Sequence, residues 1–169
     1  EDQELFTKSG LVAPAIADCL PVCGIDIEKF SPSPLPSLRG RPFCFLLVAR
    51  MLWDKGIREY VEAARSLRQR HPTVTFGLLG FLNVDNLTAI PTEQVRAWKK
   101  EGLVTYLGAP SDVRPFIADA DCVVLPSYRE GLSVVLREAA SMARPVIATD
   151  IAGCRDVVED GISGYLVKV

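Results

Sequence analysis

The sequence lacks the features that mark membrane proteins, secreted proteins and nucleic-acid binders. No apolar run approaches the roughly 20 residues that a membrane-spanning helix needs. The net charge is -2 and no block of basic residues is present, which argues against nucleic acid as the main partner. The chain opens with acidic residues and not with a signal peptide, so we expect a cytoplasmic protein.

The motifs of several enzyme classes are missing as well. His71 is the only histidine, and its place before Pro72, between an expected helix and an expected strand, leaves no Ser-His-Asp or Cys-His arrangement to assemble. Neither a Gly-x4-Gly-Lys-Ser/Thr loop nor a Gly-x-Gly-x-x-Gly fingerprint occurs. Plain nucleotide hydrolysis and dinucleotide redox chemistry are therefore disfavoured.

The cysteines indicate a reducing compartment. They are odd in number and scattered, at positions 19, 23, 44, 122 and 154. Cys19 and Cys23 have the spacing of half a metal site, but no second pair with ligand spacing follows. We therefore predict reduced thiols in the core or in loops, and no metal site.

The composition is that of one ordinary globular domain with an added segment. The chain has 169 residues, of which 49% are hydrophobic and 24% charged. Residues 31–42 hold four prolines among serines and glycine, a composition typical of linkers. We therefore expect two pieces of unequal kind, residues 1–40 and a domain over residues 41–169.

Apolar runs and helical periods alternate from Phe43 onward, after a short helix expected at residues 2–9. Strands are predicted at residues 43–49, 74–79, 103–107, 122–125, 145–148 and 164–167, and helices at 55–70, 92–101, 112–119 and 132–143. Such alternation predicts an α/β fold, a Rossmann-like, doubly wound and mostly parallel sheet of about six strands. Ligands of these sheets bind beyond the carboxyl ends of the strands, so residues 50–55, 80–86 and 127–133 are expected to converge there.

The segment between the fourth strand and its helix is the first candidate site. Gly131 lets the backbone approach a ligand closely, because it has no side chain. The amides of Leu132, Ser133 and Val134 are then helix N-terminal donors suited to a diphosphate. The alternative is a structural turn, with Ser133 as a partial helix cap.

Two carboxylates frame this segment. Glu130 lies in the loop and Glu138 lies within the helix, roughly 12 Å further along at 1.5 Å per residue. That separation is too long for a paired general acid and base, but it fits the two ends of one extended ligand with hydroxyls at both ends. In this interpretation Glu138 receives the two hydroxyls of a ribose; the alternative is a rim residue or a pair with an arginine.

A cationic pair follows the first strand. Arg50 lies at its carboxyl end and Lys55 at the start of the next helix, so both can point into one crevice. A planar guanidinium and a compact ammonium together can neutralise a diphosphate. Ordinary surface charge is the alternative.

Together these segments resemble the C-terminal, donor-binding domain of a retaining GT-B glycosyltransferase of the "glycosyl transferases group 1" family. Arg50 and Lys55 match the Arg-x4-Lys pair of that family, and Glu130 and Glu138 match its Glu-x7-Glu motif. Residues 21–30 are similar to its connector between domains, so residues 1–40 would be the end of an N-terminal domain and the interdomain connector. Residues 150–164 resemble the segment that follows the motif.

The resemblance implies residue roles and a mechanism. Arg50, Lys55 and Glu130 would be catalytic, with the cations on the donor diphosphate and Glu130 facing the transferred sugar. The donor-binding residues would be Gly80, Gly131, Leu132, Ser133, Val134 and Glu138. The reaction would transfer a sugar from a nucleotide-sugar with retention, without a metal or other cofactor.

A finer resemblance concerns residues 125–131 and 153–156, which look like a bacterial subgroup that builds surface polysaccharide or lipid-linked glycans. It implies a UDP-sugar in preference to a GDP-sugar, a polyprenyl-diphosphate-linked glycan as acceptor, and a cytoplasmic protein peripheral at the inner face of the membrane.

The family's Gly-x-Gly-Pro loop is absent after Gly80, and its N-terminal acceptor-binding domain and C-terminal helices are missing. We therefore expect this fragment to be inactive by itself. A nucleotide-sugar epimerase and a non-catalytic nucleotide-binding module are the alternatives.

Overall fold

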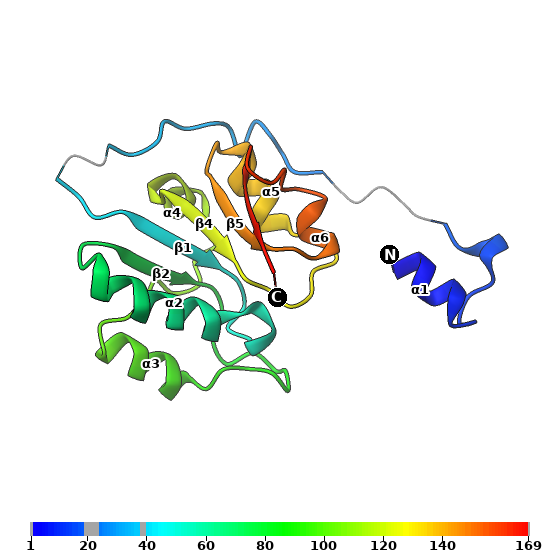
Figure 1. Ribbon diagram of the computed structural model, residues 1–169, viewed down its shortest axis with the longest axis horizontal. Helices are drawn as coiled ribbons and strands as arrows, with labels where there is room; N and C mark the ends of the chain where they lie inside the picture. Colours follow the sequence, from blue (N-terminus) through cyan, green and yellow to red (C-terminus); the bar gives the residue numbers. More distant parts are fainter. Residues whose placement is uncertain (1, 19–23, 38–39, 169) are drawn as a thin grey trace.

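The computed structural model describes residues 2–18, 24–37 and 40–168. Its centre is a six-stranded parallel sheet in the order β3-β2-β1-β4-β5-β6 (Figure 1). The strands are β1 Cys44–Val48, β2 Thr75–Leu79, β3 Thr105–Tyr106, β4 Cys122–Leu125, β5 Val146–Thr149 and β6 Gly164–Val167. The predicted α/β, doubly wound architecture is confirmed.

Helices cover both faces of this sheet. The helical elements are α1 Asp2–Lys8, η1 Pro14–Ile16, η2 Trp53–Lys55, α2 Ile57–Arg70, α3 Thr92–Lys100, α4 Arg114–Asp119, α5 Val134–Ser141 and α6 Ala152–Arg155. Helices α2 and α3 lie on one face, and α4, α5 and α6 lie on the other (Figure 1). No helix in the described ranges is long and apolar enough to cross a membrane.

The two faces have separate hydrophobic cores because side chains alternate along each strand. On β1, Leu46 packs into the cluster beneath α4 and α5, while its neighbour Leu47 packs into the cluster beneath α2 and α3. Both side chains are almost completely buried. The continuous apolar run of β1 is therefore explained by a strand that faces hydrophobic partners on both sides.

The order of the strands places a crevice between β1 and β4. The chain runs outward from β1 to β3 in one direction and from β4 to β6 in the other, so the two halves diverge at this point. Loops at the carboxyl ends of β1 and β4 therefore leave the sheet in opposite directions and open a crevice, the usual ligand position in such folds. These loops lie at the right-hand edge of the sheet in Figure 1.

Several element ends differ from the prediction, each for a local reason. Lys55 does not begin a helix: it ends the η2 turn, and Gly56, with a left-handed φ of 67°, separates that turn from α2. Thr92 is the first residue of α3, as predicted, and Pro91 precedes it as N-cap. The Thr92 hydroxyl lies 2.7 Å from Oδ1 of Asn83 and serves the neighbouring loop.

The ends of α5 were also predicted imperfectly. The helix begins at Val134, and Ser133 is its N-cap. At the other end, Ala143 lies within the predicted helix range but outside the observed helix; it is exposed, with a φ of 57° that turns the chain away. Met142, the residue before it, is buried at 4% exposure.

The described part of the connector packs against the sheet domain. It passes over the α4 and α5 side of the sheet (Figure 1), and Phe30 packs against the core of that face. The short helix α1 lies apart from the sheet domain in the same view. Cys19 and Cys23, for which we predicted reduced thiols and no metal site, lie outside the described residues.

Candidate functional site at the carboxyl edge of the sheet

The three segments predicted to converge do so. The amide of Met51 donates to the Phe81 carbonyl at 2.9 Å, which joins the loop after β1 to the loop after β2. The amide of Tyr128 donates to the Asp54 carbonyl at 2.9 Å, which joins the loop after β1 to the loop after β4. The loop after β1 is therefore the central element of the crevice.

Lys55 and Glu130 meet in this crevice. The Lys55 Nζ atom lies 2.7 Å from Oε1 of Glu130, and the two side chains are only 20% and 12% exposed. Gly56 permits this approach, because a Cβ at that position would lie 1.9 Å from the Pro126 carbonyl oxygen. Two of the three predicted catalytic residues thus form one partly buried ion pair.

The backbone of Glu130 and Gly131 rests directly on α6. A Cβ at Gly153 would lie 2.5 Å from the Glu130 carbonyl oxygen and 2.3 Å from that of Gly131, so only glycine fits there. Gly131 itself is different: a Cβ at Gly131 would meet nothing within 4 Å, and its φ is not in the left-handed region. The fold therefore requires the glycine at position 153, whereas at position 131 it leaves the Cβ direction open.

The start of α5 supplies fewer free donors than the sequence suggested. The Ser133 hydroxyl accepts from the Leu136 amide at 3.4 Å, and the Ser133 amide donates to the Gly153 carbonyl at 3.4 Å. The expectation of a free Ser133 amide is thus wrong, and the cap interpretation of its side chain is confirmed. Within the described part of the chain, the amides of Leu132 and Val134 make no hydrogen bond.

Arg50 and Gly80 share a second hollow at the same edge. This cavity of about 200 Å³ is lined by the ends of β1 and β2 and by Ala109, Pro110 and Val113. Arg50 is exposed, and among the described residues its guanidinium has no hydrogen-bond or ion-pair partner. Gly80 has a structural task, because a Cβ there would lie 1.8 Å from the Ala49 carbonyl oxygen at a φ of 143°.

Glu138 is a half-buried carboxylate on α5. Burial raises its pKa above the ordinary glutamate value, and Lys29 and Arg137 partly offset that rise. Partial burial disfavours the ionised form of the carboxylate, because it removes part of the solvating water. A hydrogen-bond donor placed beside it would therefore be bound favourably.

A hydrogen-bond network that no sequence pattern indicates joins the loops of the crevice. The Ser127 hydroxyl is completely buried, 3.1 Å from the Asp54 carbonyl oxygen. The Asp54 carboxylate accepts from the Thr88 hydroxyl at 3.0 Å, and the Glu59 carboxylate accepts from the Tyr128 hydroxyl at 2.7 Å. These bonds link positions far apart in the chain, so no local pattern could have found them.

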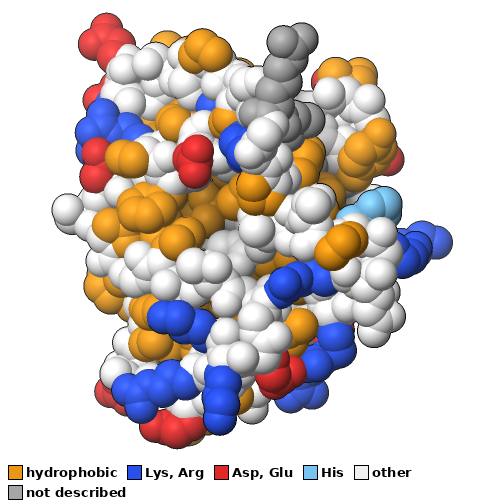
Figure 2. Space-filling model, turned by 90° about the vertical axis from the view of Figure 1, so that its left-hand side faces the viewer, with side chains coloured by type: hydrophobic (Ala, Val, Ile, Leu, Met, Phe, Trp, Pro, Cys, Tyr) orange, Lys and Arg blue, Asp and Glu red, His pale blue; other side chains and the backbone are white. Residues whose placement is uncertain are grey.

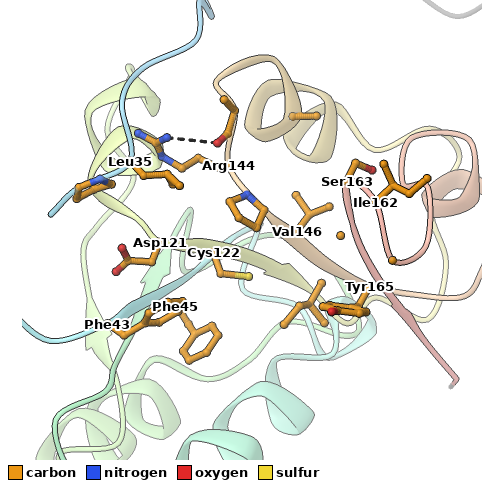
Figure 3. A pocket seen from close by; sticks show the side chains of 17 residues that line it. Leu35, Phe43, Phe45, Asp121, Cys122, Arg144, Val146, Ile162, Ser163 and Tyr165 are labelled. Carbon is orange, nitrogen blue, oxygen red and sulfur yellow. Dashed lines mark hydrogen bonds between the residues drawn. The ribbon is translucent and has the colours of Figure 1, made fainter. Parts of the chain in front are cut away.

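Another hollow lies at the opposite edge of the sheet. It has a volume of about 660 Å³ and is lined by the amino-terminal ends of β1, β4, β5 and β6. Hydrophobic side chains gather on this side of the molecule (Figure 2). Figure 3 shows Arg144 and Leu35 on one side of the hollow, and Tyr165 and Ile162 on the other. Its walls are mostly apolar and hold none of the predicted site residues.

The chain contains one Asp-x-Asp triplet, Asp119–Asp121, whose carboxylates have a spacing that suits metal ions in other proteins. Here Asp121 is buried and accepts hydrogen bonds from Arg41 and from the Cys44 amide, the latter at 2.7 Å. It therefore ties the start of β1 to the connector side of the sheet. Among the described residues, no group of three His, Cys, Asp or Glu side chains could hold a metal ion.

In open parallel sheets of this Rossmann-like kind, the crevice at the switch point is the usual ligand position. Comparison with known proteins gives the family: the "Glycosyl transferases group 1" model matches residues 42–169. The chain belongs to this family of glycosyltransferases.

Two bacterial relatives illustrate the match. An N,N'-diacetylbacillosaminyl-diphospho-undecaprenol α-1,3-N-acetylgalactosaminyltransferase from Campylobacter jejuni is 29% identical over 155 residues, covering 86% of this chain and 39% of the relative. A UDP-Gal:α-D-GlcNAc-diphosphoundecaprenol α-1,3-galactosyltransferase from Escherichia coli is 27% identical over 179 residues, covering the whole chain and 46% of the relative. The chain thus spans less than half the length of these relatives.

A solved structure extends the likeness to three dimensions. Anabaena HepE in complex with UDP-glucose superposes with a TM-score of 0.81 at 25% identity, over 98% of this chain and 47% of HepE. The fold predicted from the sequence is therefore that of a GT-B glycosyltransferase domain.

Proposed function

We propose that this chain is the donor-binding domain of a retaining glycosyltransferase that takes a sugar from a nucleotide-sugar. The observation that carries the proposal is the Lys55–Glu130 pair in the switch-point crevice, 2.7 Å apart and largely buried. Burying an ammonium or a carboxylate is costly unless the two are paired, so the pair places a cation in the crevice, where an anionic ligand would compete with Glu130 for it.

The diphosphate of the donor is proposed to bind between Lys55 and the start of α5. Lys55 would exchange its bond to Glu130 for one to the diphosphate, and the free amides of Leu132 and Val134 would donate to phosphate oxygens at the positive end of the helix. Arg50, which is exposed and without a partner among the described residues, would add a second cation from the rim.

These groups would act on the bond-breaking step. As the bond between the anomeric carbon and the diphosphate oxygen breaks, its electron pair leaves with the diphosphate, whose negative charge grows. Preorganised cations and amides stabilise that growing charge, so they lower the barrier and do not merely hold the donor. Glu130, released from Lys55, would then face the transferred sugar.

The far end of the donor is assigned to Glu138. A half-buried carboxylate with a raised pKa gains most from a ligand that donates two hydrogen bonds, as the two hydroxyls of a ribose do. The acceptor is proposed to be a lipid-linked glycan, because the Campylobacter jejuni and Escherichia coli relatives carry undecaprenol-diphosphate acceptors in their names. It would bind a further domain, absent from residues 1–169, at the inner face of the membrane.

The nucleotide is proposed to be a uridine diphosphate. Anabaena HepE, which matches almost the whole chain, was solved with UDP and with UDP-glucose. The other half of the cleft, outside residues 1–169, would select the donor sugar and the linkage that is formed.

Titration calorimetry with UDP, GDP and uridine tests this proposal on the chain as it stands. We expect measurable binding of UDP, weaker binding of GDP, and at least a tenfold loss with uridine, which lacks the diphosphate; tenfold corresponds to about 1.4 kcal/mol. Equal binding of UDP and uridine would remove the diphosphate from the crevice. Absence of any nucleotide binding would favour a scaffolding module.

A further inference from the structure

The described connector is bound to the domain at successive points. The Arg114 guanidinium donates to the Lys29 carbonyl at 3.4 Å, and the Ser141 hydroxyl donates to the Phe30 carbonyl at 2.6 Å. The Phe30 ring packs against the core of the α4 and α5 face. The chain is thus held as a strap, residues 29–34, and not as a free linker.

Arg144 fixes the end of this strap. Its guanidinium donates to the Ser33 carbonyl at 2.9 Å, the Ser33 hydroxyl at 2.7 Å and the Pro34 carbonyl at 2.9 Å. On its other side it donates to the Ile117 carbonyl at 3.1 Å and the Ala118 carbonyl at 2.7 Å. One side chain therefore joins the strap to the end of α4.

The burial of Arg144 indicates that this junction matters. The residue is 2% exposed, and burial lowers its pKa. A buried guanidinium costs several kcal/mol unless its N–H groups are satisfied, and here they are satisfied by carbonyl oxygens of the strap. A connector that only spanned two domains would not need such an anchor.

The strap begins near the proposed ribose carboxylate, Glu138. Ser141, which holds the Phe30 carbonyl, stands three residues after Glu138 on α5, so the two lie on one face of the helix one turn apart. Lys29 precedes Phe30, and its positive charge acts on Glu138. Lys29 and Arg137 are the charged groups, among the described residues, that act on this carboxylate.

We propose that the strap is part of the donor site: Arg144 is a positioning residue that holds residues 29–34 on α4 and α5, and thereby keeps Lys29 beside Glu138. This inference rests on the proposed role of Glu138 as the ribose ligand. Its consequence is that movement of the connector changes the charge environment of Glu138, and so couples whatever precedes the connector to donor affinity.

Loss of Lys29 should shift the pH dependence of UDP binding in one direction. Lys29 lowers the pKa of Glu138 against the raising effect of burial, so removing Lys29 lets that pKa rise further. A ribose diol needs the ionised carboxylate as acceptor. The acid-side loss of UDP affinity should therefore begin at a higher pH when Lys29 is absent or displaced.

The test compares Lys29→Met, Arg144→Ala and the double variant by UDP calorimetry across the acid range. We expect all three to shift the acid limb upward by the same amount, because Arg144 acts through Lys29 and the double variant has nothing more to lose. The protonation of UDP itself is common to all variants and cancels. Lys99→Met, which removes an exposed cation from α3 on the other face, is the control and should leave the profile unchanged.

Hydrogen exchange reports the strap separately from nucleotide binding. Arg144→Ala should accelerate exchange at the amides of residues 29–31 and 33, while Lys29→Met should not, and Arg144→Lys should restore part of the protection. If Arg144→Ala fails to fold, Ser141→Ala removes the Phe30 anchor alone and should shift the acid limb in the same direction.

Two results would overturn the inference. One is a pH profile unchanged in Lys29→Met; the other is a double variant whose shift is the sum of the two single shifts. If the wild-type chain binds no UDP, the proposed function fails and the strap needs a separate test. A carbon NMR titration of Glu138 in the nucleotide-free variants provides that test. An unchanged Glu138 titration in Lys29→Met would reject the strap inference.

Discussion

Lys55 and Glu130, 75 positions apart in the sequence, form a 2.7 Å ion pair beneath the loop that leads into α5. The pair joins the loops at the carboxyl ends of β1 and β4, the two neighbouring strands between which the strand order reverses. Each partner holds the other in the absence of an anion. A diphosphate that enters the crevice must therefore compete with Glu130 for Lys55.

This competition predicts opposite effects of the two neutral variants. Lys55→Met should weaken UDP binding by about tenfold or more, the size of one charge-assisted hydrogen bond. Glu130→Gln should leave UDP binding unchanged or strengthen it, because Lys55 no longer has to leave a carboxylate. Calorimetry of both variants checks this; weakening by the same factor in both would mean that the pair only supports the loop.

Gly131 and Gly153 should respond differently to alanine. Gly131→Ala adds a methyl group into open space, so we expect unchanged stability but UDP binding weaker by about tenfold if the diphosphate lies against this backbone. Gly153→Ala forces the methyl group against the Glu130 and Gly131 carbonyls and should cost about 1–3 kcal/mol of unfolding free energy. Gly24→Ala, also free of neighbours, is the matched control. Thermal unfolding and UDP titration of all three separate fold from function.

We predict that Glu138 lowers the stability of the folded chain at neutral pH and strengthens the binding of UDP. Its folded pKa is raised above the ordinary value of 4.5, chiefly by burial, so the stability it contributes is present below that value and is lost as pH rises through the folded pKa. Glu138→Gln should therefore raise the melting temperature at pH 7 and lose this advantage in acid, below the ordinary glutamate pKa.

The same variant should bind UDP more weakly at pH 7, since an amide accepts hydroxyl donors less strongly than a carboxylate. Melting curves across the acid range and calorimetry at pH 7 provide the measurements. A destabilised variant at neutral pH would show that Glu138 has a structural partner in the free chain.

The buried thiols should be inert. Burial raises the pKa of Cys122 to about 12 and that of Cys154 to about 11, and the residues are 5% and 0% exposed. Iodoacetamide at pH 8 should leave both unmodified in the folded chain and modify both in urea. Peptide mass spectrometry reads the outcome, and rapid labelling of either cysteine in the folded chain would contradict the described packing.

The sheet could be predicted from the sequence because its signals are local. Strand β4 was placed correctly at residues 122–125, since its apolar run is bounded by Asp121 and Pro126. The start of α5 was placed two residues early, because Leu132 continues the apolar pattern although Ser133 caps the helix. Periodicity locates an element, whereas a single side-chain hydrogen bond decides where it ends.

The site was only partly predictable. The convergence of the three loops follows from the geometry of a parallel sheet, and the hydrogen bonds at Met51 and Tyr128 confirm it. The Lys55–Glu130 pair could not be foreseen, since both residues had been assigned to different parts of a ligand. Arg144 was missed altogether, because an arginine in a sequence suggests the surface, and only the fold shows the carbonyl oxygens gathered around it.

A crystal structure of the chain with UDP tests the central claim most directly. We predict Lys55 Nζ within hydrogen-bond distance of a diphosphate oxygen and released from Glu130, with the amides of Leu132 and Val134 directed at the same group. UDP bound elsewhere, with the Lys55–Glu130 pair intact, would contradict the assignment of this crevice as the donor site.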